Sequence, residues 1–197
     1  MKRISSANVR IHAGLLAAGL LAWAVVAPAF DVPAPQAIPA TGTVQVAFPP
    51  WDNAEALVLG AIRDASSEIL VQAYSFTSRS IARALVAAHR RGVVVRVLAD
   101  SEQTQQMENS QIPELAAAGI RVSLETRYQS AHSKVIVIDA GTSAETVLTG
   151  SYNWTYAAQS KNAENLIVLR GDAPLTRAYR DNWLRHAAGT QAYEPGR

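Results

Sequence analysis

The stretch HSKVIVID, from His132 to Asp139, decides the fold. Its four consecutive apolar residues are β-branched and predict a strand. Because successive side chains of a strand alternate between its two faces, His132 and Lys134 are expected to point the same way. The stretch therefore predicts a strand that delivers an imidazole and an ammonium group side by side.

A second polar group follows the next predicted strand. Residues 134–139 and 146–150 are expected to form a hairpin joined by a loop of several residues. Directly after it, the sequence Gly150-Ser151-Tyr152-Asn153 repeats the two-residue spacing with Ser151 and Asn153, and Gly150 allows a close approach of the backbone. If the strands pair in this way, the polar side chains meet at one end of the sheet, and Glu164 opens the following strand within reach.

The first half of the chain alternates between predicted strands and helices. Strands are expected at residues 44–48, 68–74 and 93–98, and alternating apolar residues predict that the first is half-buried. A capping box at Asp52 and Glu55 begins one helix, and Gly92 ends another that starts near Thr77 or Ser78. The order βαβαβ predicts an α/β fold in a single domain, with a mixed, largely parallel β-sheet flanked by helices on both faces.

The second half continues with shorter elements. Residues 100–111 are polar without clear periodicity and are expected to form a loop that lines the site. The remaining predicted elements are a helix at 113–118, a strand at 120–124, a helix near 154–159, a strand at 165–169 and a final helix at 173–186. No internal repeat is visible in the sequence.

The N-terminal residues carry a targeting pattern. Three of the 18 Lys and Arg side chains lie in the first ten residues, and without them the 16 acidic side chains are in slight excess. An uncharged apolar stretch and the triplet Ala27-Pro28-Ala29 follow, as in a secretory signal peptide, and an uncleaved membrane anchor is the alternative. We expect an exported, periplasmic or secreted protein, organised as signal peptide or anchor (1–29), Pro/Ala-rich linker (30–43), catalytic domain (44–190) and C-terminal tail (191–197).

The composition excludes several kinds of site. The chain has no cysteine, so disulfides, thiolate nucleophiles and cysteine-based zinc sites are excluded. A metal-dependent hydrolase is a weak alternative, because His132 and Asp139 lack a third convergent ligand and the pattern H-E-x-x-H does not occur. We therefore expect neither a metal ion nor another cofactor.

The predicted cluster of polar groups suits a phosphate diester. Lys134, Ser151 and Asn153 can hold its non-bridging oxygens and stabilise the charge that gathers on them. A neutral imidazole at His132 can attack phosphorus when a carboxylate holds its other nitrogen, and Glu164 is the candidate for that partner. Each residue alone is ordinary, but the spaced set is rare by chance and favours a catalytic function.

These motifs resemble those of the phospholipase D superfamily, whose signature is His-x-Lys-x4-Asp followed by Gly-Ser-x-Asn. Because the chain carries one such motif, it is similar to small bacterial exported endonucleases. The resemblance implies the phospholipase D/nuclease fold and a phosphohistidine intermediate. The roles it implies are nucleophile for His132, phosphate binding for Lys134 and Asn153, assistance for Ser151, and orientation of the imidazole for Glu164.

Two members of the motifs are expected to be structural. Gly150 permits the close approach of the backbone described above. Asp139 lies at the far end of the strand and, by alternation, on the opposite face from His132. Asp139 is therefore expected to be a hydrogen-bonding group of the scaffold rather than a catalyst.

A single motif supplies a single catalytic histidine. Enzymes of this superfamily use two, one as nucleophile and one as the acid that protonates the departing oxygen. The remaining histidines, His12, His89 and His186, are expected to be solvated residues rather than that acid. The resemblance thus implies a homodimer with one composite active site on its two-fold axis.

The substrate stays open between nucleic acid and phospholipid. A run of arginines, Arg79, Arg83, Arg90, Arg91 and Arg96, could track a nucleic-acid backbone or merely solvate a helix face. A non-specific endonuclease acting on DNA or RNA is the favoured interpretation, and a phospholipase D that releases phospholipid head groups is the alternative. An inert interaction module is a remote third, because such a module is expected to have lost His132 or Lys134.

Overall fold

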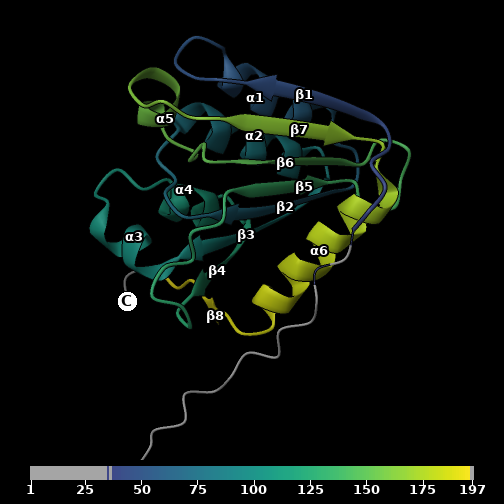
Figure 1. Cartoon of the computed structure of the whole chain (residues 1–197). Coiled ribbons are helices and arrows are strands. Elements are labelled where there is room, and N and C mark those ends of the chain that lie inside the picture. Colours follow the sequence, from purple (N-terminus) through teal and green to yellow (C-terminus); the bar gives the residue numbers. More distant parts are fainter. Residues whose placement is uncertain (1–34, 36, 196–197) are drawn as a thin grey trace, which may run out of the picture. The chain divides into compact units, whose positions relative to one another are not determined.

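The computed structural model describes residue 35 and residues 37–195 (Figure 1). The predicted signal peptide at 1–29 and part of the predicted linker at 30–43 lie outside the described residues. Apart from Pro35, the described residues belong to one compact unit that begins at Ala37. None of the helices in this part of the chain has the length and apolar character required to cross a lipid bilayer.

Eight strands form one sheet within the described residues, in the order β1-β7-β6-β5-β2-β3-β4-β8. The strands are β1 (Thr43–Ala47), β2 (Glu68–Ala73), β3 (Val94–Asp100), β4 (Arg121–Glu125), β5 (Val135–Ile138), β6 (Thr146–Gly150), β7 (Leu166–Arg170) and β8 (Gln191–Ala192). Only β2, β3 and β4 pair in parallel, and every other pairing is antiparallel. The predicted mixed sheet is confirmed, but the expectation that it is largely parallel is wrong, because the hairpin β5–β6 and the strands beside it reverse direction.

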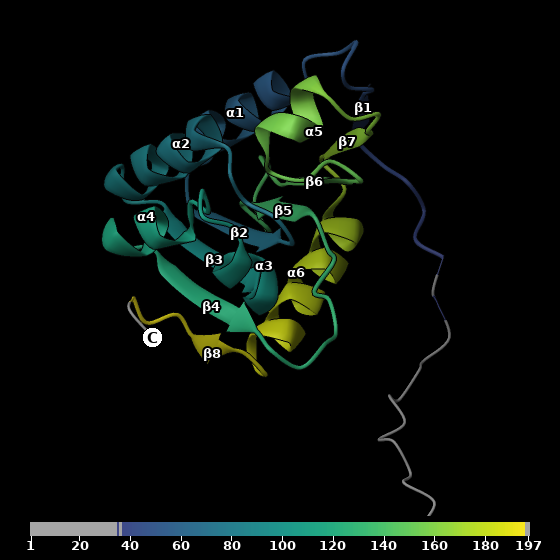
Figure 2. The same cartoon turned by 90° about the vertical axis from the view of Figure 1, so that its left-hand side faces the viewer.

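Helices cover both faces of the sheet, as predicted (Figure 2). They are α1 (Ala54–Asp64), α2 (Arg79–Arg90), α3 (Ser101–Gln106), α4 (Ile112–Ala117), α5 (Tyr156–Ser160) and α6 (Ala173–Ala187). The larger core cluster joins one face of the sheet to α1, α2, α4 and α5, with Leu85 and Leu115 fully buried. On the other face, α6 places Trp183 in a smaller cluster with Leu70 and Val137.

The structure corrects two predictions about where and how helices α1 and α3 begin. The side chain of Asn53, not the predicted capping box at Asp52 and Glu55, caps α1 by accepting the amide of Ala56 at 3.0 Å. Residues 100–111 are not simply a loop, because α3 begins there behind the cap residue Asp100. None of the residues of α3 is buried, so the sequence shows no apolar period at this point.

Strand β1 lies at one edge of the sheet and pairs only with β7 among the described strands. The predicted half-buried strand is wrong for β1, since Val44 is 58% and Val46 53% exposed. Its antiparallel pairing with β7 also removes it from the predicted βαβαβ series. Local alternation does not encode the partner of a strand, and at this edge position only Ala47 of β1 is buried.

The topology brings several chain segments to the same ends of the central strands. This row of strand ends is here called the site edge, and it is distinct from the lateral edge formed by β1. Register pairs Gln72 near the end of β2 with Val135 at the start of β5, and Gly150 at the end of β6 with Leu166 at the start of β7. Strands β3 and β4 run parallel to β2 and end at the same edge. Segments that follow β2, β3, β4 and β6, or precede β5 and β7, therefore lie there.

Candidate active site

His132 and Lys134 lie just before β5 and contact each other directly. Lys134 Nζ is 2.8 Å from Nδ1 of His132 and donates to the carbonyl oxygen of His132 at 2.6 Å. They precede the strand instead of lying in it, yet the structure brings the two side chains together. His132 is exposed at the surface, whereas Lys134 is only 5% exposed.

An aromatic ring that the sequence motifs did not indicate contacts both residues of this pair. Tyr74 follows β2 at the site edge, and its ring centroid is 4.3 Å from that of His132. The ammonium of Lys134 lies 4.8 Å from the centroid of the same ring. A cation over an aromatic face is favourable, so Tyr74 holds both functional groups. The sequence could have indicated Tyr74 by its position at the end of the predicted strand 68–74.

Burial changes the ionisation of Lys134. Loss of water around the ammonium lowers its pKa from 10.5 to about 8, although the carboxylate of Glu164 acts in the opposite direction. A desolvated ammonium lacks the water shell that would otherwise compete with an incoming anion. The environment of Lys134 therefore suits the binding of an anion.

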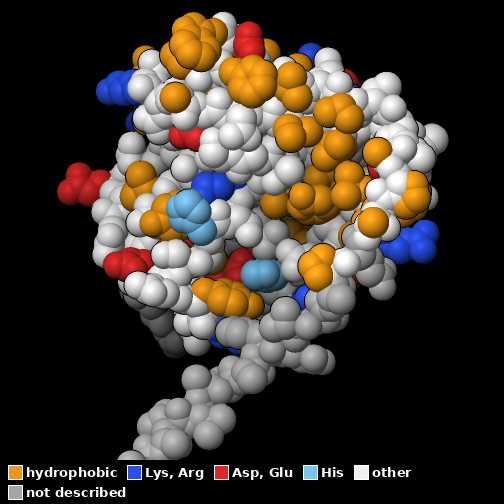
Figure 3. Space-filling model, viewed as in Figure 1, with side chains coloured by type: hydrophobic (Ala, Val, Ile, Leu, Met, Phe, Trp, Pro, Cys, Tyr) orange, Lys and Arg blue, Asp and Glu red, His pale blue; other side chains and the backbone are white. Residues whose placement is uncertain are grey.

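Ser151 and Glu164 form a second polar pair at the same edge. Ser151 Oγ donates to Glu164 Oε2 at 2.5 Å and accepts the backbone amide of Asn165 at 3.0 Å. Asn162 Nδ2 donates to the other carboxylate oxygen of Glu164 at 3.0 Å. These bonds connect the segment after β6 to the segment before β7. Figure 3 shows one histidine side chain beside a basic side chain, and a second histidine, separate from the first, beside an acidic one.

The predicted contact between Glu164 and His132 is not made in this single chain. Among the described residues, the imidazole has Lys134 and Tyr74 as its contacts, while Glu164 binds Ser151 and Asn162. The carboxylate acts on Lys134 only electrostatically. The role of Glu164 in orienting the imidazole therefore stays a prediction.

Gly150 and the residues after it fix the path of the second motif. Gly150 has φ 152°, and a Cβ atom there would lie 2.3 Å from the carbonyl oxygen of Asn165, so only glycine allows β6 and β7 to approach this closely. Tyr152 and Trp154 are fully buried anchors on either side of Asn153. Asn153 is half-buried, and its Oδ1 atom has no hydrogen-bond partner among the described residues.

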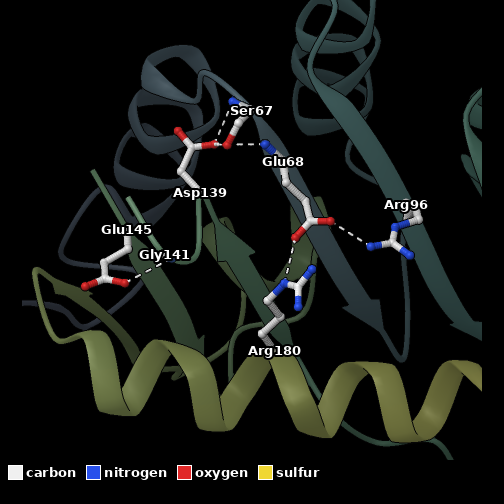
Figure 4. Close-up of polar contacts among 7 residues, drawn as sticks. All are labelled: Ser67, Glu68, Arg96, Asp139, Gly141, Glu145 and Arg180. Atoms are coloured by element: carbon white, nitrogen blue, oxygen red, sulfur yellow. Dashed lines mark hydrogen bonds and ion pairs between the residues drawn. The ribbon is translucent and has the colours of Figure 1, made fainter. Parts of the chain in front are cut away.

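Asp139 lies at the other end of β5, away from this cluster. Figure 4 shows its carboxylate directed toward Ser67 and Glu68. Asp139 is 1% exposed and has φ 51°. Its two oxygens accept five hydrogen bonds of 2.7–2.9 Å, from the amides of Ser66, Ser67 and Glu68 and from both serine hydroxyls. Burial alone would raise the pKa of Asp139, but these hydrogen bonds outweigh it and hold the pKa at about 2.

One histidine outside the motif differs from its prediction. His186, expected to be merely solvated, has Nδ1 2.6 Å from Oε2 of the buried Glu125 and packs against the ring of Tyr128, with centroids 5.3 Å apart. In the part of the chain that the structure describes, no group of three or more His, Cys, Asp or Glu side chains is arranged to hold a metal ion.

Comparisons with known proteins agree with this arrangement. A family described as "Cardiolipin synthase, PLD-like domain" matches residues 58–186. Phospholipase D of Rickettsia conorii is 37% identical over 145 residues, covering 74% of this chain and 70% of that protein. Mitochondrial cardiolipin hydrolase of Xenopus laevis is 36% identical over 138 residues, covering 70% and 63%.

A solved structure extends the likeness to three dimensions. The crystal structure of Nuc from Salmonella typhimurium, a phospholipase D family member, has a TM-score of 0.72 and 35% sequence identity, and the match covers 77% of this chain and 98% of that one. The family match spans more than half of the chain and includes every residue of both motifs. The chain belongs to the phospholipase D-like family and is a phosphodiesterase of the phospholipase D superfamily.

Proposed function

We propose that this phosphodiesterase is an endonuclease that hydrolyses nucleic acid without a metal ion, through a phosphohistidine intermediate on His132. The observation that carries the proposal is the pairing of an exposed imidazole with the buried, desolvated ammonium of Lys134. Ser151 and Glu164 lie at the same edge of the sheet and supply a hydroxyl and a carboxylate. This set can bind a phosphate and attack it.

In the proposed first step, the ammonium of Lys134, the hydroxyl of Ser151 and the carboxamide of Asn153 bind the non-bridging oxygens of the phosphate. Binding draws Lys134 away from Nδ1 of His132, so that this nitrogen can carry the proton and take Glu164 as its partner. Nε2 then attacks phosphorus, a P–N bond forms, and the P–O bond to the leaving group breaks. Water later attacks phosphorus and gives up a proton to the group that protonated the leaving oxygen, which breaks the P–N bond and restores the imidazole.

The departing oxygen needs a proton, and we propose that His132 of a second copy donates it. The dimer would place one composite site on its two-fold axis. Mixed dimers of wild-type and His132→Ala chains, separated by two affinity tags, are expected to be inactive. Half of the wild-type activity in the isolated mixed dimers would show that one chain suffices.

Nucleic acid is proposed as the substrate because of the similarity to Nuc. The match covers 98% of the length of Nuc. Two members of the arginine run make contacts within the chain. Arg96 binds Glu68 at 2.7 Å, and Arg91 donates to three backbone carbonyls, so both are occupied within the chain. The similarity to proteins named phospholipase D and cardiolipin hydrolase keeps phospholipid as the second candidate.

The test uses purified wild-type protein and a His132→Asn variant, each with plasmid DNA, phosphatidylcholine vesicles and cardiolipin vesicles, all in EDTA. Nicking of DNA by the wild type alone is expected. Release of a head group without DNA cleavage would replace the nuclease proposal by a phospholipase. Activity that appears only after a divalent metal is added would contradict the phosphohistidine mechanism.

Export is proposed from the N-terminal pattern at residues 1–29. We expect the protein recovered from the periplasm or medium to begin near Phe30 when its N-terminus is sequenced. An intact N-terminus in the membrane fraction would indicate the anchor instead.

A further inference from the structure

The nucleophile is carried by a connecting segment rather than by a strand. Residues 126–134, here called the site loop, join β4 to β5 and contain His132. In the sheet, β2 and β3 lie between β5 and β4. The site loop therefore has to cross the ends of these two strands at the site edge (Figure 2). What holds the loop down at this crossing determines where the imidazole lies.

A buried carboxylate occupies the crossing point. Asp100 is the last residue of β3 and is 3% exposed. Its Oδ2 accepts the backbone amide of Ala131 at 2.8 Å, and its Oδ1 accepts the amide of Gln103 at 2.8 Å. One oxygen thus anchors the site loop and the other caps α3. Ala131 is itself buried and directly precedes His132.

We propose that Asp100 is the positioning residue of the nucleophile. The inference rests on the proposed role of His132 in phosphodiester cleavage. The exposed imidazole of His132 contacts Tyr74 and Lys134, and its preceding peptide is fixed in addition by a buried, charge-assisted hydrogen bond. A reacting atom that moves by about 1 Å can lose about 100-fold in rate. Asp100 acts through the backbone of Ala131 and does not touch the substrate.

The chain offers a matched control for a merely structural role. Asp172 is also 3% exposed and also divides its two oxygens between a helix cap and a distant segment. Its Oδ1 accepts the amide of Leu175 at 3.1 Å and caps α6, and its Oδ2 accepts the amide of Thr41 at 3.0 Å. Asp172 follows β7 at the edge opposite the site edge, so its loss perturbs the fold without moving the site loop.

Serine is the informative replacement at both positions. A serine hydroxyl still caps a helix but is too short to accept the second amide as well. In Asp100→Ser we expect kcat on bis(p-nitrophenyl) phosphate to fall about 10- to 100-fold with KM little changed, and the Ala131 amide to exchange faster with deuterium. Asp172→Ser is expected to keep the wild-type kcat. Thermal unfolding verifies that both variants are folded at the assay temperature. If Asp100→Ser is not folded there, Asp100→Asn, whose side chain keeps one acceptor oxygen, is used in its place.

The outcomes separate the two claims. An Asp100 variant as active as Asp172→Ser, or one whose Ala131 amide exchanges as slowly as in the wild type, overturns the positioning role alone. Full activity in His132→Asn, or an inactive wild type, overturns the proposed function, and the positioning role falls with it.

Discussion

Replacing Asp139 with asparagine should reduce stability while leaving catalysis intact. The carboxylate accepts five hydrogen bonds from Ser66, Ser67 and the first residue of β2, Glu68, and lies at the opposite end of β5 from His132. Asparagine retains one acceptor oxygen, and its amide group meets donors that it cannot satisfy. The loss therefore falls on the attachment of β5 to β2, not on the site edge.

The magnitude follows from the pKa of Asp139. A fall from 3.8 to about 2, at about 1.4 kcal/mol per pKa unit, corresponds to about 2 kcal/mol. Because the folded pKa lies below the unfolded one, this stabilisation is fully present above pH 3.8 and is lost as the pH falls through about 2. For a chain of this size the variant should melt about 4–8 °C lower at pH 7.

Urea unfolding at pH 7 and pH 3, together with cleavage assays at a temperature where both proteins are folded, measures the two effects. The difference in unfolding free energy between wild type and Asp139→Asn should shrink at pH 3. His132→Asn is the matched opposite, with normal stability and no activity. A folded Asp139→Asn protein that has lost its kcat would refute the assignment of Asp139 to the scaffold.

Three further predictions concern other residues. The ratio kcat/KM should fall as the pH rises through about 8, because the ammonium form of Lys134, which is proposed to bind phosphate, is lost above its pKa. A pH profile of Lys134→Arg, which stays charged, should lack this fall. Gly150→Ala should cost at least about 2 kcal/mol in urea unfolding, since the new methyl group would clash with the backbone of Asn165 at a strained φ. Trp183→Phe should cost about 1–2 kcal/mol and leave kcat unchanged, because it removes the hydrogen bond from Nε1 to the carbonyl of Val71, 3.0 Å long, which involves none of the reacting groups.

The fold was predictable where the pattern is local. The run Val135–Ile138 and the segment Thr146–Gly150 pair as the expected hairpin, because turn residues separate two β-branched runs. The cap at Ser78 and the glycine after Arg91 likewise mark the ends of α2. Helix α3 was missed because it buries no residue, and β1 was misplaced because strand order depends on distant partners.

The site was predictable to the same extent. Two-residue spacing was enough to bring His132 and Lys134 together even though neither lies in a strand. The partner of Glu164 was not predictable, because its bond to Ser151 depends on how two loops meet. The role of Asp100 was not predictable either, since nothing in the sequence distinguishes it from other acidic residues in polar segments. Only the structure identifies the backbone amide that it binds.

The edge position of β1 has a consequence for handling the protein. Among the described strands its outer side has no partner and presents backbone donors and acceptors, flanked by Val44 and Val46, which are both more than half exposed. Such an edge is a template for strands of other molecules, so concentrated samples are expected to self-associate there by extending the sheet. A lysine at position 46 would add a charge that resists this stacking, and it lies outside the catalytic cluster.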